Sequence, residues 1–238
     1  MNIKNITSVG EELEGGMCSY SFDRLMSKLN TDEFREIKRR LETGTDGSVD
    51  VDIYCDDEDE YRNLELRTWI EVEELEKLIK FIELLWRHGF VQNDSCGNHM
   101  HFKFKNTFYI SIFTIYDAVR DYLTAYREKY GGRRKYMRRL MSRYSKNIES
   151  EEDIAINLTD DRYYAINLLS YFKHRSRTLE IRIMPYAHDE HEYIDMLIFN
   201  IETIDRIVEK YRDSFRKTFE MKLPRLSSST DATEVVIL

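Results

Sequence analysis

Two glutamates near the N-terminus have the spacing of a metal-binding pair. Glu12 and Glu14 flank Leu13, and the apolar residues on either side predict a β-strand. Successive side chains of a strand point to opposite faces, so the two carboxylates share one face. Carboxylates this close repel each other unless a cation or a shared proton lies between them. Because Mg²⁺ and Mn²⁺ prefer oxygen ligands, the pair predicts a divalent-cation site, with a solvated strand face as the plainer interpretation.

Three later segments repeat this arrangement of polar side chains. They carry Glu65 with Arg67, His99 with His101, and Glu180 with Arg182, each pair two residues apart. Taken singly, each pair is explained as simply by an ion pair or a hydrogen-bonded histidine as by a ligand site. Taken together on one face, they describe a concave site for divalent metals and a polyphosphate. Since Mg²⁺ usually takes one or two carboxylates beside phosphate oxygens and water, several glutamates indicate more than one ion.

A basic segment forms a second candidate feature. Residues 133–143 contain six lysines and arginines and no acidic residue, although the whole chain has a net charge of −8. Capture of an anionic ligand and a solvated helix face explain this segment equally well. The preceding Gly131-Gly132 would allow it to move as a lid over such a ligand.

The elements that would position these residues follow from hydrophobic periodicity and turn residues. We expect strands over residues 6–14, 49–54, 63–69, 96–104 and 177–185, helices over 22–41, 72–88, 108–129 and 190–221, and buried strand or helix over 153–158 and 163–171. Gly15-Gly16 should end the first strand, residues 30–32 should break the first helix, and Gly89 should end the second. The strands with polar pairs are apolar on their other face. The sequence therefore predicts an α+β fold, an antiparallel sheet with an open active-site face and helices packed on the other face.

Composition restricts the class of protein. The chain has 238 residues, only two prolines and nine glycines, which favours a single domain over residues 1–222 and a flexible tail over 223–238. The negative net charge argues against broad nucleic-acid binding. No apolar run approaches membrane-spanning length, and the N-terminus lacks the apolar region of a signal peptide. Three scattered cysteines are too few for a disulfide framework and indicate a reducing compartment, so we expect a cytoplasmic protein.

Six short motifs, in order along the chain, resemble the amidoligase family. They are Gly10–Glu14, Asp46–Ser48, Glu65-Leu66, Cys96–His101, Arg162 with Asn167, and Thr178–Arg182, and together they span roughly residues 8 to 185. That family belongs to the carboxylate–amine ligases related to glutamine synthetase and glutamate–cysteine ligase. The resemblance implies a glutamine-synthetase-like catalytic fold. It also implies ATP-dependent formation of an amide or isopeptide bond through an acyl phosphate. The partners would be ATP, a carboxylate substrate (an amino acid or a peptide) and an amine acceptor.

The resemblance further implies which residues hold the metal and the substrates. Mg²⁺ or Mn²⁺ ions bridging the ATP phosphates would be held by Glu12, Glu14, Glu65, His99 and Glu180, with His101 as a further ligand or as a support for one. Arg182 would face the γ-phosphoryl group or the acceptor carboxylate, with assistance from Arg177. Contacts with ATP would come from Arg162, Asn167 and Ser48. Asp46 would shape the rim of the substrate pocket together with Ser48, and it is a candidate acceptor of the proton that the amine loses.

Two other classes of function fit parts of the same pattern. A metal-dependent hydrolase could hold catalytic zinc through His99, His101 and a glutamate, with water at the fourth position. A catalytically inactive binding module could use the basic segment and the apolar C-terminal end to contact a partner. Four glutamates are more oxygen ligands than zinc needs, and Arg182 suits a phosphate better than a zinc-bound water. The sequence therefore favours the ligase over both alternatives.

Overall fold

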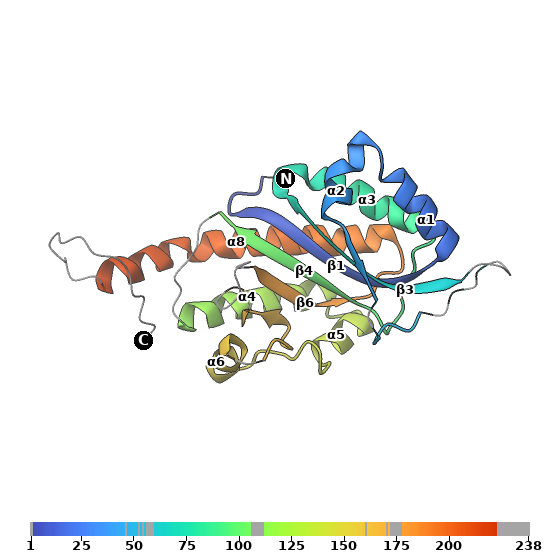
Figure 1. Ribbon diagram of the computed structural model, residues 1–238. Coiled ribbons are helices and arrows are strands. Elements are labelled where there is room, and N and C mark those ends of the chain that lie inside the picture. The colour runs from blue at the N-terminus through green and yellow to red at the C-terminus, as the bar shows by residue number, and fades with distance from the viewer. Residues whose placement is uncertain are drawn as a thin grey trace.

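The computed structural model describes residues 2–45, 47–51, 53, 55, 60–105, 112–159, 161–169, 171 and 178–222. Their fold is α+β, built on a six-stranded sheet in which every neighbouring pair of strands is antiparallel (Figure 1). The strand order is β2-β3-β1-β4-β6-β5. The strands are β1 (Ile6–Cys18), β2 (Glu42–Gly44), β3 (Tyr61–Glu71), β4 (Gly97–Phe104), β5 (Ile166–Asn167) and β6 (Leu179–Pro185). The predicted antiparallel sheet is confirmed.

Helices cover one face of this sheet and part of the other. They are α1 (Ser19–Lys28), α2 (Arg35–Arg40), α3 (Leu75–Arg87), α4 (Ile112–Tyr130), α5 (Arg134–Leu140), α6 (Glu151–Thr159) and α8 (Glu190–Lys222), with short 3₁₀ turns at Asp32–Phe34 and Val72–Glu74. The long α8 crosses behind the sheet in Figure 1. It contacts the apolar face, where Asn200 on α8 approaches the sulfur of Met100 on β4 at 3.2 Å. One hydrophobic core extends from Ile6 on β1 to Ile207 on α8.

Helix boundaries agree closely with the turn residues in the sequence. The first helical region is interrupted after α1, as the residues around Asn30 predicted, and resumes at Asp32. Gly89 follows α3 with a φ of +83°, the left-handed conformation that glycine adopts without steric cost. Residues 106–111, where the third expected helix was to begin, and the tail at 223–238 lie outside the described residues.

Two strand predictions are wrong, and both errors involve a close approach of a loop to β1. The strand does not end at Gly15-Gly16 but continues to Cys18. A Cβ on Gly15 would lie 2.3 Å from the Phe90 ring, and one on Gly16 would lie 2.7 Å from Ile53 Cδ1. These glycines therefore make room for neighbouring loops instead of terminating the strand.

The strand expected over residues 49–54 is absent from its described part. The backbone N–H of Asp50 donates to Ser95 Oγ at 2.9 Å, and that of Val51 donates to Asn63 Oδ1 at 3.2 Å. Side chains thus take the place of a neighbouring strand as hydrogen-bond acceptors for these two residues. Val51 is buried even so, because the segment packs over Gly16.

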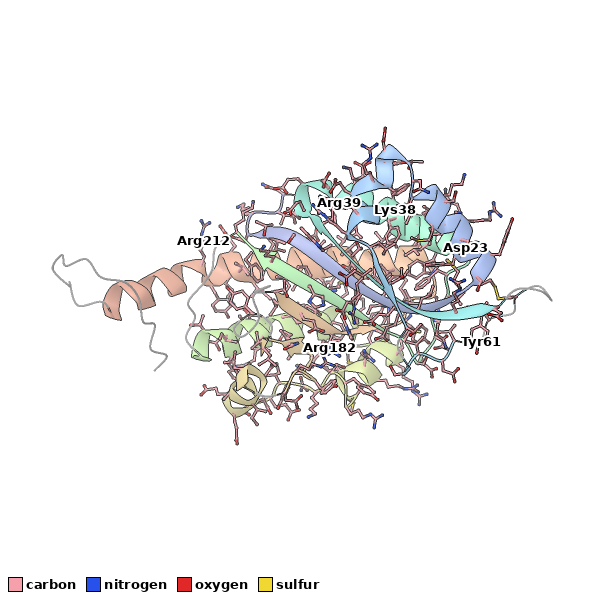
Figure 2. All side chains as sticks on the ribbon, viewed as in Figure 1. Asp23, Lys38, Arg39, Tyr61, Arg182 and Arg212 are labelled. Carbon is pink, nitrogen blue, oxygen red and sulfur yellow. A yellow bond between two sulfur atoms is a disulfide. The ribbon has the colours of Figure 1, made fainter. Side chains whose placement is uncertain are left out.

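A disulfide bond contradicts the expectation drawn from the cysteines. Cys18 at the end of β1 is bonded to Cys55, and Cys96 is a buried free thiol (the bond is drawn in yellow in Figure 2, near Tyr61). Disulfides persist mainly in oxidising compartments, so the cysteines no longer indicate a reducing one. Cytoplasmic location stays a prediction. Within the described part of the chain, every helix is too short or too polar to cross a membrane.

We predict that this disulfide stabilises the fold by restricting the unfolded chain. Cys18 and Cys55 are 37 residues apart, and a loop of that size corresponds to roughly 3 to 4 kcal/mol in the chain-entropy model. Cys55→Ser should lower the free energy of unfolding by about that amount in urea titrations. A reductant should lower the free energy of unfolding of the wild type by the same amount and leave that of the variant unchanged. Titration of the unreduced, denatured wild type should find one thiol, that of Cys96. Three thiols would show that the bond is absent.

Candidate functional site

The face of the sheet away from α8 forms the floor of a cleft of about 930 Å³. Ten of the residues predicted for the site are described, and all ten line this cleft: Glu12, Glu14, Ser48, Glu65, His99, His101, Arg162, Asn167, Glu180 and Arg182. Asp46 and Arg177 lie outside the described residues. The polar pairs therefore meet on one face, as their two-residue spacing predicted (Arg182 is labelled in Figure 2).

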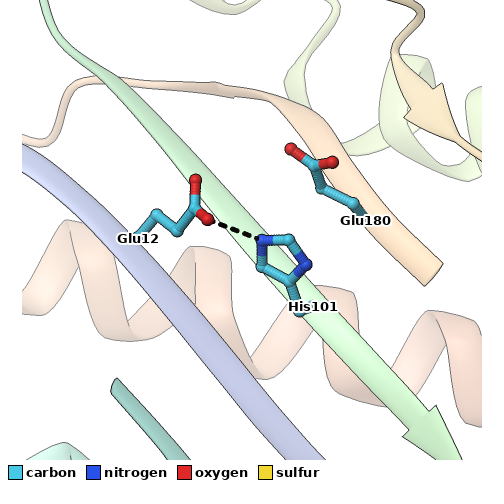
Figure 3. Close-up of side chains that lie close together, drawn as sticks. All are labelled: Glu12, His101 and Glu180. Carbon is cyan, nitrogen blue, oxygen red and sulfur yellow. Dashed lines mark ion pairs between the residues drawn. The ribbon is translucent and has the colours of Figure 1, made fainter. Parts of the chain in front are cut away.

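Three side chains from neighbouring strands form a compact cluster in the cleft. Glu12 on β1, His101 on β4 and Glu180 on β6 each place a nitrogen or oxygen atom within 4.8 Å of the other two (Figure 3). The strand pairing explains the proximity, because Glu12 is opposite His99, and His101 is opposite Glu180. One imidazole and two carboxylates at this separation match the donor set of a divalent cation such as Mn²⁺ or Mg²⁺.

The two histidines of β4 carry nitrogen atoms that suit a metal. His99 Nδ1 lies 3.0 Å from Glu12 Oε2, within hydrogen-bond distance, and this contact orients the ring. The Nε2 atoms of His99 and His101 are both buried and lack a hydrogen-bond partner among the described residues. His101 Nε2 lies 3.2 Å from Glu12 Oε1, which makes an ion pair possible, but the geometry is not that of a hydrogen bond. A bound cation would satisfy these ring nitrogens, so the residues present fit a metal.

Electrostatic compensation replaces the repulsion expected between carboxylates. Burial would raise the pKa of Glu12, but the neighbouring His101 and His99 rings outweigh it and hold the pKa well below its ordinary value. Burial would lower the pKa of His101, but Glu12 and Glu180 keep it above its ordinary value. For Glu180, burial is outweighed by the charges of Arg182 and the two histidines, so its pKa is also lowered. The expected need for a cation or a shared proton is therefore met by the protein's own side chains.

The other two predicted glutamate ligands lie in the cleft but have different partners. Glu65 on β3 accepts a hydrogen bond of 2.7 Å from Arg67, whose guanidinium also lies 3.7 Å from Glu12. Glu14 accepts a hydrogen bond of 2.5 Å from the backbone N–H of Gly97 on β4. Neither belongs to the cluster of Glu12, His101 and Glu180. They would therefore serve a second ion, not the one held by this cluster.

Glu180 has the predicted phosphoryl contact Arg182 and two predicted nucleotide contacts, Asn167 and Arg162, in its neighbourhood. Arg182 is buried, forms an ion pair with Glu180, and donates through Nε to the carbonyl oxygen of Tyr144 at 3.3 Å. Asn167 on β5 donates to the same carboxylate at 2.5 Å. Arg162 is exposed at the edge of the cleft. An anion that enters here would meet two guanidinium groups beside the candidate metal ligands.

The basic segment forms one side of the cleft. Arg134, Lys135, Arg138 and Arg139, all on α5, line it. The helix is anchored by buried Tyr136 and Leu140, and the Tyr136 ring stacks on Tyr130 at 4.2 Å between ring centres. The interpretation as a solvated helix face is therefore incomplete, because this face borders the candidate site. The sheet face is likewise not fully open, since α5 covers one end of it.

Arg139 shows how closely α5 approaches the sheet. A Cβ on Gly97 would lie 2.0 Å from an Arg139 guanidinium nitrogen, so the arginine side chain would have to shift if this position were not glycine. Arg139 Nε also donates to the carbonyl oxygen of Arg182 at 3.4 Å. Burial lowers the pKa of Arg139, and the negative charge of Glu14 partly offsets this effect. Arg139 thus joins α5 to both β4 and β6.

Several residues of the cleft were not predicted as site residues. Ser95, Tyr144, Tyr163 and Tyr186 all line it. Arg67, which the sequence placed in a polar pair with Glu65 without a role of its own, lines it as well. The tyrosines and Ser95 belong to loops without a periodic pattern, so their location depends on the packing of distant segments.

No protein-family model, curated protein or solved structure matches this chain. The class of the site is therefore argued from its geometry. Carboxylates and imidazoles lie at the centre, guanidinium groups surround them, and the volume is in the upper range of small-molecule sites. Such a site suits a metal together with an anionic ligand.

We predict that Mn²⁺ binds at the cluster of Glu12, His101 and Glu180. Glu180→Gln and His101→Ala should each weaken Mn²⁺ binding by about 10-fold or more in calorimetric titrations, since each removes a ligand. Glu71→Gln is the matched control, because Glu71 lies on the same sheet but outside the cleft. Equal Mn²⁺ affinity of wild type, variants and control would show that this cluster is not a metal site.

Proposed function

We propose that this protein is an ATP-dependent carboxylate–amine ligase that forms an amide or isopeptide bond. The observation that carries the proposal is the contact between Arg182 and Glu180 beside Glu12 and His101. A metal-ligand set and a buried guanidinium thereby border the same space in one cleft. The order of motifs that resembles the amidoligase family supports it independently of this geometry. A glutamine-synthetase-like fold is part of the same proposal.

Metal-ligating and basic residues of the cleft would have different roles in phosphoryl transfer. Glu12, His101 and Glu180 would hold Mg²⁺ or Mn²⁺, which supplies neutralisation of phosphate charge when bound. Arg182, whose guanidinium pairs with Glu180 on the same strand, would contact the phosphoryl group in transfer. Arg162 and the cations of α5 add positive charge around the cleft. Most of the rate enhancement would come from positioning and from stabilising charge that develops in the transition state.

The proposed reaction has two steps. A carboxylate oxygen of the acid substrate attacks the γ-phosphorus of ATP, the bond from that phosphorus to the bridging oxygen breaks, and ADP leaves. The amine nitrogen then attacks the carbonyl carbon of the acyl phosphate. The carbon–oxygen bond to phosphate breaks, inorganic phosphate leaves, and the nitrogen loses one proton. Guanidinium groups suit both anionic substrates because they form paired hydrogen bonds with carboxylates and phosphates.

The donor set makes a zinc hydrolase the weaker alternative. Catalytic zinc is commonly held by three protein ligands with one position left for water. Here the cluster combines two carboxylates with one imidazole, and Arg182 contacts one of the carboxylates directly. A guanidinium there would compete with the metal for a carboxylate without helping a zinc-bound water. Stoichiometric, tightly held zinc in the purified protein would favour the hydrolase.

We predict that the protein transfers oxygen from an acid substrate to phosphate. Incubation with Mg²⁺, ATP, a pool of carboxyl-¹⁸O-labelled amino acids and short peptides, and hydroxylamine as the amine should release ¹⁸O-labelled phosphate and a hydroxamate. The label moves because the carboxylate oxygen becomes the bridging oxygen of the acyl phosphate. Mass spectrometry detects both products and identifies the acid.

Glu180→Gln should abolish both products, and Glu71→Gln should retain them. Release of unlabelled phosphate without a hydroxamate would show that ATP is hydrolysed directly by water, and the ligase proposal would then be wrong. Zinc-dependent cleavage of peptides in the pool would instead support the hydrolase.

We predict that the basic face of α5 binds the acid substrate. Arg134 and Arg138 are exposed, lie one helical turn apart and line the cleft. Exposed charge pairs contribute up to about 1 kcal/mol each, so Arg134→Gln with Arg138→Gln should raise the KM of the acid roughly 3- to 10-fold at low salt. The KM should also become less sensitive to added NaCl, because salt screens the interaction that has been removed.

The matched control is Arg35→Gln with Arg39→Gln, a pair with the same spacing on α2 and outside the cleft. Its KM and salt dependence should equal those of the wild type. If the α5 variant also behaves like the wild type over the whole salt series, this face of the helix has no part in binding the acid.

A further inference from the structure

Two tyrosines expose their rings at the end of the cleft beside β5. Tyr144 follows α5 and Tyr163 precedes β5, and the two residues are 39% and 38% exposed. The ring centres are 6.2 Å apart, with an angle of 68° between the planes. Together the two side chains present aromatic surface in a cleft whose other lining residues are mostly charged. This feature has no part in the roles proposed so far.

Guanidinium groups connect this aromatic pair with the candidate metal ligands. Arg162 and Arg182 lie 5.2 and 5.6 Å from the centre of the Tyr163 ring. Arg182 also contacts Glu180 and donates to the carbonyl oxygen of Tyr144. The aromatic surface is thus separated from the Glu180 carboxylate by a single side chain. A ligand could rest an aromatic group on the tyrosines while its phosphates reach the metal ligands.

The third tyrosine of the cleft, among the described residues, offers no comparable surface. Tyr186 packs edge to face against His188 at 5.0 Å between ring centres, and Lys135 Nζ lies 4.6 Å from its ring centre. Lys135 on α5 also donates to the carbonyl oxygen of Tyr186, so this tyrosine lies beside α5, at the end of the cleft where the acid substrate is proposed to bind. The two ends of the cleft therefore differ in chemistry, one aromatic and one cationic.

We propose that Tyr144 and Tyr163 form the base-binding end of the nucleotide site, where the purine of the nucleoside triphosphate stacks on the Tyr163 ring. Rings of this type bind bases through stacking of π-faces, and arginine adds a cation–π contribution. The inference rests on the proposed ATP-dependent function and extends it, because it orients the nucleotide. The base lies toward β5, the phosphates lie over Glu180, and the α5 end is left for the acid.

Binding of two ligands that share a triphosphate tests this inference. Calorimetry would compare Mg-ATP with Mg-tripolyphosphate in the absence of the acid and the amine. Tyr163→Ala should weaken Mg-ATP binding about 10-fold, which is within the range for loss of one base–aromatic stack. It should leave Mg-tripolyphosphate binding unchanged, since that ligand has no base. Tyr163→Phe keeps the ring and should bind Mg-ATP like the wild type.

Tyr20→Ala is the matched control. Tyr20 is an exposed tyrosine with Arg24 at 5.7 Å from its ring centre, and it lies on α1 outside the cleft. Thermal unfolding of each variant would verify its fold. Equal losses of Mg-ATP and Mg-tripolyphosphate binding, or no loss of either, would overturn the base site and leave the ligase proposal standing. A wild type that binds neither ligand would overturn both.

Discussion

The antiparallel register between β1 and β4 is the constraint on which the site depends. It places Glu12 opposite His99 and Gly10 opposite His101. A Cβ on Gly10 would lie 3.2 Å from the Cβ of His101, so glycine at this position leaves the histidine room on the sheet face. A shift of the register by one residue would turn Glu12 toward the core and Glu11 toward the cleft. The contacts of Glu12 with His99 and His101 therefore depend on this pairing, and those of Glu180 depend in addition on the pairing of β4 with β6.

The opposite environments of two adjacent glutamates show how strongly the sheet separates its faces. Glu12 lies among histidines in the cleft, and its pKa is well below the ordinary value. Glu11 is buried beneath α8, and burial raises its pKa well above the ordinary value even though Tyr193 donates a hydrogen bond to it. A carboxyl group that is neutral at physiological pH can be kept in an apolar core, whereas an ionised one cannot be kept there without a partner. One strand thus carries an acid with a raised pKa on one face and an acid with a lowered pKa on the other.

Charge compensation gives the cleft a defined arrangement before any ligand binds. Arg67 pairs with Glu65, the histidines with Glu12, and Arg182 with Glu180. These side chains are held in place by one another, so the site does not need to be assembled from mutually repelling carboxylates. A cation that enters must take over contacts that histidine and arginine now make. An anion that enters at the same time offers those groups a new partner, which links metal and anion binding physically.

The sequence by itself determined which residues share a face, because alternation along a strand is a local property. From it came the pairs of β1, β3, β4 and β6, the antiparallel sheet and the long helix α8. The tertiary structure decided the contacts between distant segments, which local patterns do not contain. The packing of Tyr136 and Leu140 into the core and the contacts of α5 with β6 placed this helix beside the cleft, and loop packing over Gly15 and Gly16 extended β1. The bond between Cys18 and Cys55, and the meeting of Tyr144 with Tyr163, join segments that are distant in sequence. Such contacts depend on how whole elements pack, and composition and spacing within a segment carry no record of that packing.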